Sequence, residues 1–198
     1  MKIEDKLFPE KITINIQGRL QVWDSPKVMA IVNLTPDSFF KGSRIQSNDL
    51  NFGKKIEKMV LDGADILDLG GYSSRPGADD IDVDMELERI LPAIRWISKE
   101  FPQTPISIDT FRSQVAKEAI LNGAHIVNDI SSGNLDPKMI ETVGVLKVPY
   151  IAMHMRGTPQ TMKHQTEYKD IVKEILQFFS QKLLQLKEFV LFRRWCST

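Results

Sequence analysis

Five short runs of apolar residues recur along the chain, and each is followed by a polar loop and then by a pattern with helical periodicity. The runs occupy residues 28–33, 66–70, 106–109, 125–130 and 150–154. Continuous apolar runs of this length are typical of strands that are buried on both faces. Because strands alternate with helices, the pattern predicts right-handed parallel βαβ units and therefore an α/β fold.

Two α/β architectures fit this alternation: an open doubly wound sheet and a TIM (β/α)8-type barrel. A dinucleotide-binding sheet carries a glycine-rich turn after its first strand. Here Asn33 is followed by Leu-Thr-Pro-Asp-Ser instead. The pattern therefore disfavours a dinucleotide-binding fold, while other open sheets remain alternatives to the barrel.

The helical segments have recognisable ends. Asp84 is expected to cap a helix whose apolar residues repeat every three or four positions, with Pro102 helping to end it. Ser113 is expected to cap the next helix and Gly123 to terminate it. A longer helix is predicted over residues 168–187. Its apolar stripe consists of Ile171, Val172, Ile175, Leu176, Phe179, Leu183 and Leu186.

Two further apolar segments precede the first βα unit. Residues 12–16 and 20–23 flank Gln17-Gly18-Arg19, which predicts a β-hairpin that caps the bottom of a barrel; the alternative is a frayed N-terminal arm. There is no linker or low-complexity stretch. We therefore expect one domain over residues 1–198, made of the hairpin (1–27), five βα units (28–187) and an atypical tail (188–198).

Composition and charge exclude several classes of protein. The chain has 26 basic and 26 acidic residues, so no net charge favours nucleic acid or an anionic membrane surface as a partner. No apolar run approaches the roughly 20 residues of a membrane span. The polar N-terminus does not resemble a signal peptide, and the single cysteine, Cys196, rules out an internal disulfide. We expect a cytoplasmic protein.

Polar residues gather where the predicted strands end. Asn33, Asp109 and His154 each end one run, Asn128 and Asp129 lie near the end of another, and a Gly-Gly-Tyr-Ser-Ser-Arg segment follows the second. In a barrel these ends form one face, which is where catalytic groups lie. A single such residue is more often a turn or a helix cap, but polar groups at all five ends favour a functional site.

The histidines carry a weaker signal. His125 opens a strand at the opposite end of the sheet, and we expect it to be structural. We interpret His154 as architectural and place His164 in a loop. We therefore expect no metal site built on histidine.

Several segments, taken in order, resemble the signature motifs of the dihydropteroate synthases. The two long ones are Asn-Leu-Thr-Pro-Asp-Ser-Phe at 33–39 and Gly-Tyr-Ser-Ser-Arg-Pro-Gly-Ala at 71–78. Three shorter ones follow at 107–110, 127–130 and 153–157. The resemblance implies a (β/α)8 barrel in which the amine of p-aminobenzoate displaces pyrophosphate from a 6-hydroxymethyl-7,8-dihydropterin diphosphate, giving 7,8-dihydropteroate. It also implies Mg²⁺ as a cofactor that assists the leaving group.

The resemblance assigns two residues to the pterin. Asp109 matches the family's pterin-binding aspartate, and a carboxylate is a strong acceptor for the N–H donors of the pterin edge. Its charge would also favour a developing cation at the pterin methylene, so Asp109 is counted as catalytic. Asn128 matches the pterin-binding asparagine, and its amide can both donate and accept hydrogen bonds.

The other assigned residues lie near the diphosphate and p-aminobenzoate. Asn33 matches the ligand of Mg²⁺ or of its bound diphosphate. Arg75 matches a catalytic loop arginine, whose guanidinium suits phosphate oxygens. Ser74 replaces a threonine that is common in the family, and Phe39 and Pro76 would help to form the wall of the p-aminobenzoate pocket. The loops that contain these residues are expected to fold over the diphosphate.

The resemblance ends near Lys187. The family's sixth-strand Asp-Pro-Gly segment, its seventh-strand lysine and its final Arg-x-His segment have no match in residues 188–198. Five parallel strands cannot close an eight-stranded barrel. We therefore expect this chain alone to have negligible synthase turnover. Full-length members of the family are expected to be homodimers that bind only small-molecule substrates, with no nucleic acid and no membrane.

Two other readings remain open. One is a methyltetrahydrofolate-dependent methyltransferase-like pterin-binding domain, which also uses an Asp and an Asn for the pterin but needs no diphosphate loop. The segments at 33–39 and 73–78 favour the synthase. The other is a noncatalytic fragment that pairs with another chain.

Overall fold

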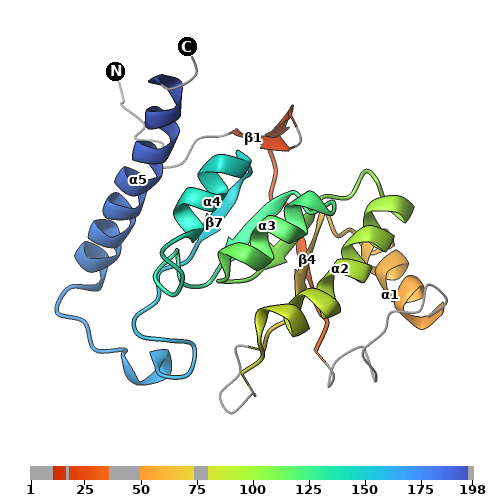
Figure 1. The fold of residues 1–198 in the computed structure, drawn as a ribbon, viewed down its shortest axis with the longest axis horizontal. Helices are drawn as coiled ribbons and strands as arrows, with labels where there is room; N and C mark the ends of the chain where they lie inside the picture. The colour runs from red at the N-terminus through yellow and green to blue at the C-terminus, as the bar shows by residue number, and fades with distance from the viewer. Residues whose placement is uncertain (1–10, 17, 36–49, 74–79, 196–198) are drawn as a thin grey trace.

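The computed structural model describes residues 11–16, 18–35, 50–73 and 80–195, and the side chains of these residues except Leu50 and those after residue 188. Two strands come first, and five βα units follow (Figure 1). The elements are β1 (Ile12–Ile16), β2 (Arg19–Trp23), β3 (Met29–Asn33), α1 (Leu50–Leu61), β4 (Ile66–Gly70), α2 (Val83–Glu100), β5 (Ile106–Asp109), α3 (Ser113–Leu121), β6 (Ile126–Asp129), α4 (Met139–Leu146), β7 (Tyr150–Ala152), the 3-10 helix η1 (Met162–His164) and α5 (Ile171–Trp195).

The strands form two sheets. β1 and β2 pair as an antiparallel hairpin, which confirms the predicted hairpin over a frayed arm. The larger sheet is parallel, with the order β3-β4-β5-β6-β7. This order follows the sequence without a reversal, whereas a doubly wound sheet reverses its order at a switch point. The topology therefore matches five consecutive units of a TIM barrel. Among the described residues, β3 and β7 each pair along one edge only.

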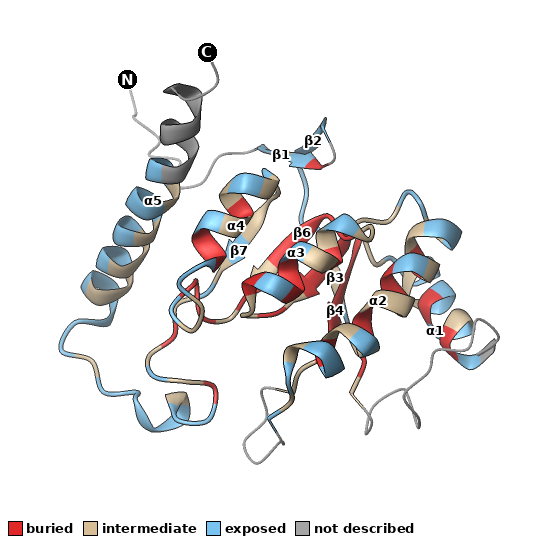
Figure 2. Ribbon diagram, viewed as in Figure 1, coloured by how far each residue is buried: buried red, intermediate tan, exposed pale blue. Residues whose placement is uncertain are grey.

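The two faces of the large sheet have different coverings. One face packs against α1 to α4 and forms the main core (Figures 1 and 2). Its strand residues are Ala30, Val32, Leu67, Leu69, Ile106, Ile108, Val127 and Tyr150. We call the opposite side the inner face. At its amino end Ile66 and Ile126 pack with Ile16 and Trp23, so the hairpin covers this end of the inner face.

The strands end slightly earlier than the sequence predicted at two places. The fourth predicted run ends at Asp129 instead of residue 130, and the fifth ends at Ala152 instead of residue 154. After β6 the backbone turns sharply, because the Asp129 carboxylate accepts a hydrogen bond from the backbone N–H of Ser131 at 2.7 Å. Ser132 then has a positive φ of 51°. The first strand begins at Met29 instead of residue 28.

Both predicted helix caps are wrong. α2 is capped by Asp82, whose side chain accepts from the backbone N–H of Met85 at 2.8 Å, while Asp84 lies inside the first turn. The Ser113 side chain does not cap α3. The backbone N–H of Ser113 instead donates to the Asp136 carboxylate at 2.7 Å, and Asp136 comes from the loop before α4. Gly123, just after α3, has φ +115°, as expected for a residue that terminates a helix.

α5 differs most from its prediction. It runs from Ile171 through Trp195 instead of over residues 168–187, since good helix formers continue past Lys187 and neither proline nor glycine interrupts them. Its predicted apolar stripe is largely exposed: Ile171, Val172, Leu176 and Leu183 face solvent. The reason is that α4 is the main element against which α5 packs in the described structure, at the far left of Figure 1. Leu186 is the member of the stripe that reaches the main core.

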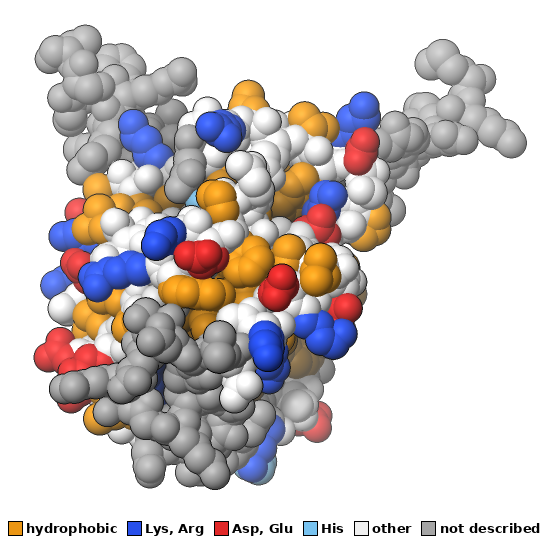
Figure 3. Space-filling model, turned by 90° about the vertical axis from the view of Figure 1, so that its right-hand side faces the viewer, with side chains coloured by type: hydrophobic (Ala, Val, Ile, Leu, Met, Phe, Trp, Pro, Cys, Tyr) orange, Lys and Arg blue, Asp and Glu red, His pale blue; other side chains and the backbone are white. Residues whose placement is uncertain are grey.

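The surface has mixed charge. On the face in Figure 3, acidic and basic side chains alternate with hydrophobic ones. This agrees with the equal numbers of acidic and basic residues. None of the helices in the part of the chain that the structure describes combines the length and hydrophobicity of a bilayer crossing.

Candidate functional site

The candidate site is a row of residues at the carboxyl ends of four neighbouring strands. Strand pairing places Asn33 of β3 opposite Gly70 of β4, Gly70 opposite Asp109 of β5, and Asp109 opposite Asn128 of β6. Because residues alternate between the faces of a strand, all four belong to the inner face. The structure thus brings together three residues that the sequence singled out from segments up to 95 positions apart: Asn33, Asp109 and Asn128.

Gly70 leaves space in the middle of this row. A Cβ built at Gly70 would touch the Asp109 side chain, with 3.5 Å to Oδ2. The carboxylate of Asp109 therefore borders an open position instead of a neighbouring side chain. The backbone carbonyl of Gly70 also accepts from the N–H of Leu34 at 2.8 Å, which extends the pairing of β3 and β4 beyond Asn33.

A further carboxylate lies one layer below the row. Asp68 of β4 is 6% exposed, and its Oδ2 accepts a hydrogen bond from Nδ2 of Asn128 at 3.0 Å. This contact fixes the orientation of the Asn128 amide, because the carboxylate accepts the hydrogen bond and only the amide nitrogen can donate it. The Oδ1 of Asn128 is then directed elsewhere. Oδ1 of Asp68 is buried and has no hydrogen-bond partner among the described residues.

Sequence reasoning missed Asp68, although a signal existed. It is a charged residue inside the apolar run Ile-Leu-Asp-Leu-Gly of β4. A buried carboxylate in such a run is costly unless it is paired or has a role. The missing information was its partner, because Asn128 lies 60 positions away in the sequence.

The row is electrostatically unusual because carboxylates are crowded in it. Burial, and after it the negative charges of Asp68, Glu86 and Asp129, together raise the pKa of Asp109 to about 7. Burial also raises the pKa of Asp68. A partner that donates N–H groups would relieve this repulsion and would stabilise the ionised form of Asp109. The row is therefore suited to a ligand with several hydrogen-bond donors.

Asp129, next to Asn128, belongs to the opposite face and has a structural role. Its carboxylate is fully buried and accepts from the backbone N–H and hydroxyl of Ser131, from the N–H of Gly133 and from the hydroxyl of Tyr150, at 2.7–2.8 Å. These four bonds hold the turn after β6 against β7. Burial and the Asp129 charge raise the pKa of Tyr150, so its hydroxyl stays a donor.

The remaining predicted site residues cannot be placed. Phe39, Ser74, Arg75 and Pro76 lie outside the described residues. Their roles therefore stay predictions from the sequence.

The histidines are placed away from the row or in packing contacts. His125 lies at the amino end of the sheet, where its Nδ1 accepts from the N–H of Ile106 at 3.1 Å, and burial lowers its pKa. The ring of His154 packs edge-on against Phe178, with 4.9 Å between centroids. His164 is part of η1 instead of a loop. The residues that the structure describes contain no cluster of three or more His, Cys, Asp or Glu that could hold a metal.

Comparison with known proteins gives a consistent result. The family model described as "Pterin binding enzyme" matches residues 29–195. The folic acid synthesis protein fol1 of Pneumocystis carinii is 47% identical over 168 residues, which is 85% of this chain and 22% of that protein. The dihydropteroate synthase of Escherichia coli K12 is 37% identical over 183 residues, 92% of this chain and 61% of that enzyme.

Solved structures agree with these relatives. A Yersinia pestis dihydropteroate synthase in complex with a sulfonamide drug has a TM-score of 0.78 and 32% identity, covering 90% of this chain and 64% of that one. A Xanthomonas albilineans dihydropteroate synthase with 4-aminobenzoic acid has a TM-score of 0.76 and 33% identity, covering 89% and 62%. The chain thus spans less than two thirds of the length of each protein named here.

Proposed function

The chain belongs to the pterin-binding enzyme family, and on that basis we propose that it forms the pterin-binding part of a dihydropteroate synthase. In the proposed reaction p-aminobenzoate and 6-hydroxymethyl-7,8-dihydropterin diphosphate give 7,8-dihydropteroate and pyrophosphate. The observation that carries the proposal is the row of Asn33, Asp109 and Asn128 above Asp68 on the inner face. The named relatives and the synthase structures support it.

Asp109 and Asn128 recognise the pterin in this proposal. The pterin edge presents both N–H donors and acceptors. The ionised Asp109 accepts from the donors, and charge-assisted bonds of this kind are stronger than neutral ones. Asp68 holds the Asn128 amide nitrogen, which leaves the amide oxygen of Asn128 to accept from the ligand. A donor-rich ring also lowers the repulsion that raises the pKa of Asp109.

The chemical step exchanges one bond for another at the pterin methylene. The bond from this carbon to the diphosphate oxygen breaks, and its electron pair leaves with pyrophosphate. The neutral amine of p-aminobenzoate forms the new carbon–nitrogen bond and then loses a proton. Asp109 stabilises positive charge that develops on the pterin. Phe39, Ser74, Arg75 and Pro76 are proposed to bind the amine substrate and the diphosphate.

Mg²⁺ fits this site only if it binds together with the diphosphate of the substrate. The described residues offer no three-ligand protein cluster for a metal, but Mg²⁺ retains waters and takes phosphate oxygens, so one protein oxygen suffices. Asn33, at the end of β3 in the same row, would supply it. When bound, the ion would neutralise charge on the leaving diphosphate. Asn33 would hold and orient this end of the substrate.

The proposal is tested by titrating the purified chain with 6-hydroxymethyl-7,8-dihydropterin in a calorimeter. We expect Asp109→Asn to weaken binding by roughly 10- to 100-fold, since a charge-assisted bond is worth about 1.5–3 kcal/mol. Asp62→Asn, at an exposed aspartate after α1, is the matched control and should bind like the unaltered chain. Equal affinities for the two variants would refute the assignment. An assay of dihydropteroate formation from labelled p-aminobenzoate, the pterin diphosphate and Mg²⁺ tests the separate expectation that this chain alone has negligible synthase turnover.

The methyltransferase-like alternative predicts different ligand affinities. Such a domain would bind the unphosphorylated pterin but gain no affinity from a diphosphate, whereas a synthase should bind the pterin diphosphate more tightly.

The homodimeric state and the cytoplasmic location remain predictions. Gel filtration with light scattering would measure the oligomeric state.

A further inference from the structure

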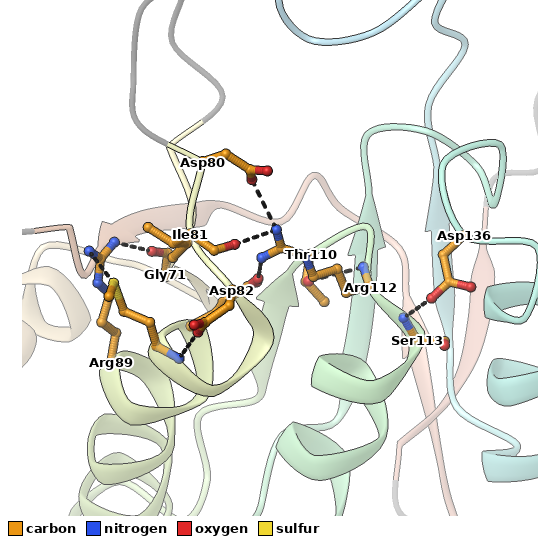
Figure 4. Close-up of polar contacts among 11 residues, drawn as sticks. Gly71, Asp80, Ile81, Asp82, Arg89, Thr110, Arg112, Ser113 and Asp136 are labelled. Carbon is orange, nitrogen blue, oxygen red and sulfur yellow. Dashed lines mark hydrogen bonds and ion pairs between the residues drawn. The ribbon is translucent and has the colours of Figure 1, made fainter.

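Arg112 contacts several elements at the edge of the sheet that carries the row of Asn33, Gly70, Asp109 and Asn128. It lies three residues after Asp109, directly before α3, and its side chain is only 15% exposed. Its partners come from the connection between β4 and α2 and from α2 itself (Figure 4). This arginine was not among the residues that the sequence singled out.

The guanidinium reaches the beginning of the β4–α2 connection through an aromatic contact. Its carbon lies 5.0 Å from the ring centroids of both Tyr72 and Phe111. These two rings meet edge to face, with 5.0 Å between centroids. A cation next to two aromatic rings is attracted by their electrons. Tyr72 and Asp80, from the first and last parts of the connection, both contact this guanidinium, and the Asp80 carboxylate adds to the effect of burial in raising the pKa of Tyr72.

The same guanidinium reaches the end of the connection through hydrogen bonds. Nη2 donates to the carbonyl oxygen of Ile81 at 2.6 Å and to Oδ1 of Asp80 at 3.2 Å, as Figure 4 shows. Nη1 donates to Oε2 of Glu86, a fully buried carboxylate in the first turns of α2. The planar fork of an arginine can serve such diverging acceptors at once, whereas a lysine is a point charge.

We propose that Arg112 is a positioning residue that clamps the two ends of the β4–α2 connection beside the end of β5, which carries Asp109. Both Nη atoms donate to protein acceptors, so we assign Arg112 an action through the connection. The consequence rests on the proposed function, because Arg75, which the family resemblance assigns to the diphosphate, comes between the two clamped ends in the sequence. Loss of the clamp should therefore impair the diphosphate end of the site and spare the pterin end.

The variant for testing the clamp must not leave Glu86 as an unpaired buried charge. The double variant Glu86→Gln/Arg112→Met removes both members of the pair. Arg95→Met is the matched control. It removes an arginine of α2 together with its hydrogen bond from Nε to Oδ1 of Asn122 at 2.8 Å, but Arg95 lies far along the helix from the connection.

The first measurement does not depend on any ligand. Chymotrypsin cleaves after Tyr72, whose ring the clamp holds, and cleavage of a native protein reports local opening. We expect the double variant to be cut after Tyr72 at least 10-fold faster than the unaltered chain, and Arg95→Met to be cut at the normal rate. Equal cleavage rates for both variants would overturn the clamp.

The second measurement separates positioning from general destabilisation. The affinity of the double variant for 6-hydroxymethyl-7,8-dihydropterin should stay within 2-fold, while its affinity for the diphosphate of the same pterin should fall at least 10-fold. Equal weakening of both ligands would show a merely structural role. If the unaltered chain bound neither ligand, the proposed function would fail, and the cleavage rates would still decide whether Arg112 is a clamp.

Discussion

Asp109→Asn should make the folded chain more stable at neutral pH while it weakens pterin binding. The pKa of Asp109 rises from 3.8 to about 7 because the carboxyl is buried and because Asp68, Glu86 and Asp129 surround it with negative charge. A carboxyl whose pKa is higher in the folded chain binds protons more tightly there than in the unfolded chain. Its ionisation therefore lowers the free energy of unfolding as the pH rises from about 4 to about 7.

The magnitude follows from the size of this shift. A rise of about three pK units corresponds to about 4 kcal/mol at pH values above 7, since each unit is worth about 1.4 kcal/mol. Asparagine removes the charge but keeps a polar group that must find partners in the same place. We therefore expect Asp109→Asn to raise the free energy of unfolding by about 1–3 kcal/mol at pH 8.

Urea denaturation of both proteins at pH 8 and pH 4 checks this reasoning. At pH 4 the carboxyl of folded Asp109 is protonated and resembles the amide, so the difference between the two proteins should shrink to a few tenths of a kcal/mol. A variant that is less stable at pH 8, or a difference that is the same at both pH values, would refute it. Such a result would mean that Asp109 is not a strained carboxyl held for a ligand.

Three further predictions follow from other contacts. Pterin affinity should fall about 10-fold per pH unit below pH 7, because only ionised Asp109 accepts the ring's donors; calorimetry from pH 5 to 8 would show this, and a flat profile would contradict it. Asp82→Ala should lower the free energy of unfolding by about 1 kcal/mol through loss of the α2 cap, whereas Asp84→Ala should cost less; equal costs in urea titrations would argue against the cap. Tyr150→Phe should cost about 1–3 kcal/mol, because Asp129 loses a buried donor; an unchanged thermal midpoint would contradict this.

The local pattern was sufficient to predict the five strands of the large sheet and their parallel direction, whereas the barrel-like strand order was implied by the family resemblance. Mostly apolar runs bounded by polar loops predicted β4 and β5 with their observed bounds, although Asp68 and Ser107 lie within these strands. The position of Asp109 and Asn33 at strand ends follows from the same pattern. Parallel strands all present their carboxyl ends at one edge, so the meeting of these residues was predictable as well.

Contacts between residues that are far apart in the sequence were not predictable. The caps show this on a small scale: the N–H of Ser113 is satisfied by Asp136 from the next loop, which no local rule could identify. α5 shows it on a larger scale. Its sequence has an apolar stripe, but a stripe becomes buried only where another element covers it, and Leu176 and Leu183 have no such cover in the described structure.

The sequence by itself therefore determined the α/β alternation, the strand positions to within one or two residues and the family's motif residues, because these depend on neighbours along the chain. The tertiary structure alone decided which partners several polar residues have. It paired Asp68 with Asn128, turned Asp129 toward the helices, and brought Arg112 to both ends of the β4–α2 connection. The physical reason is that the charge state and orientation of a buried polar group are set by the groups that surround it in space.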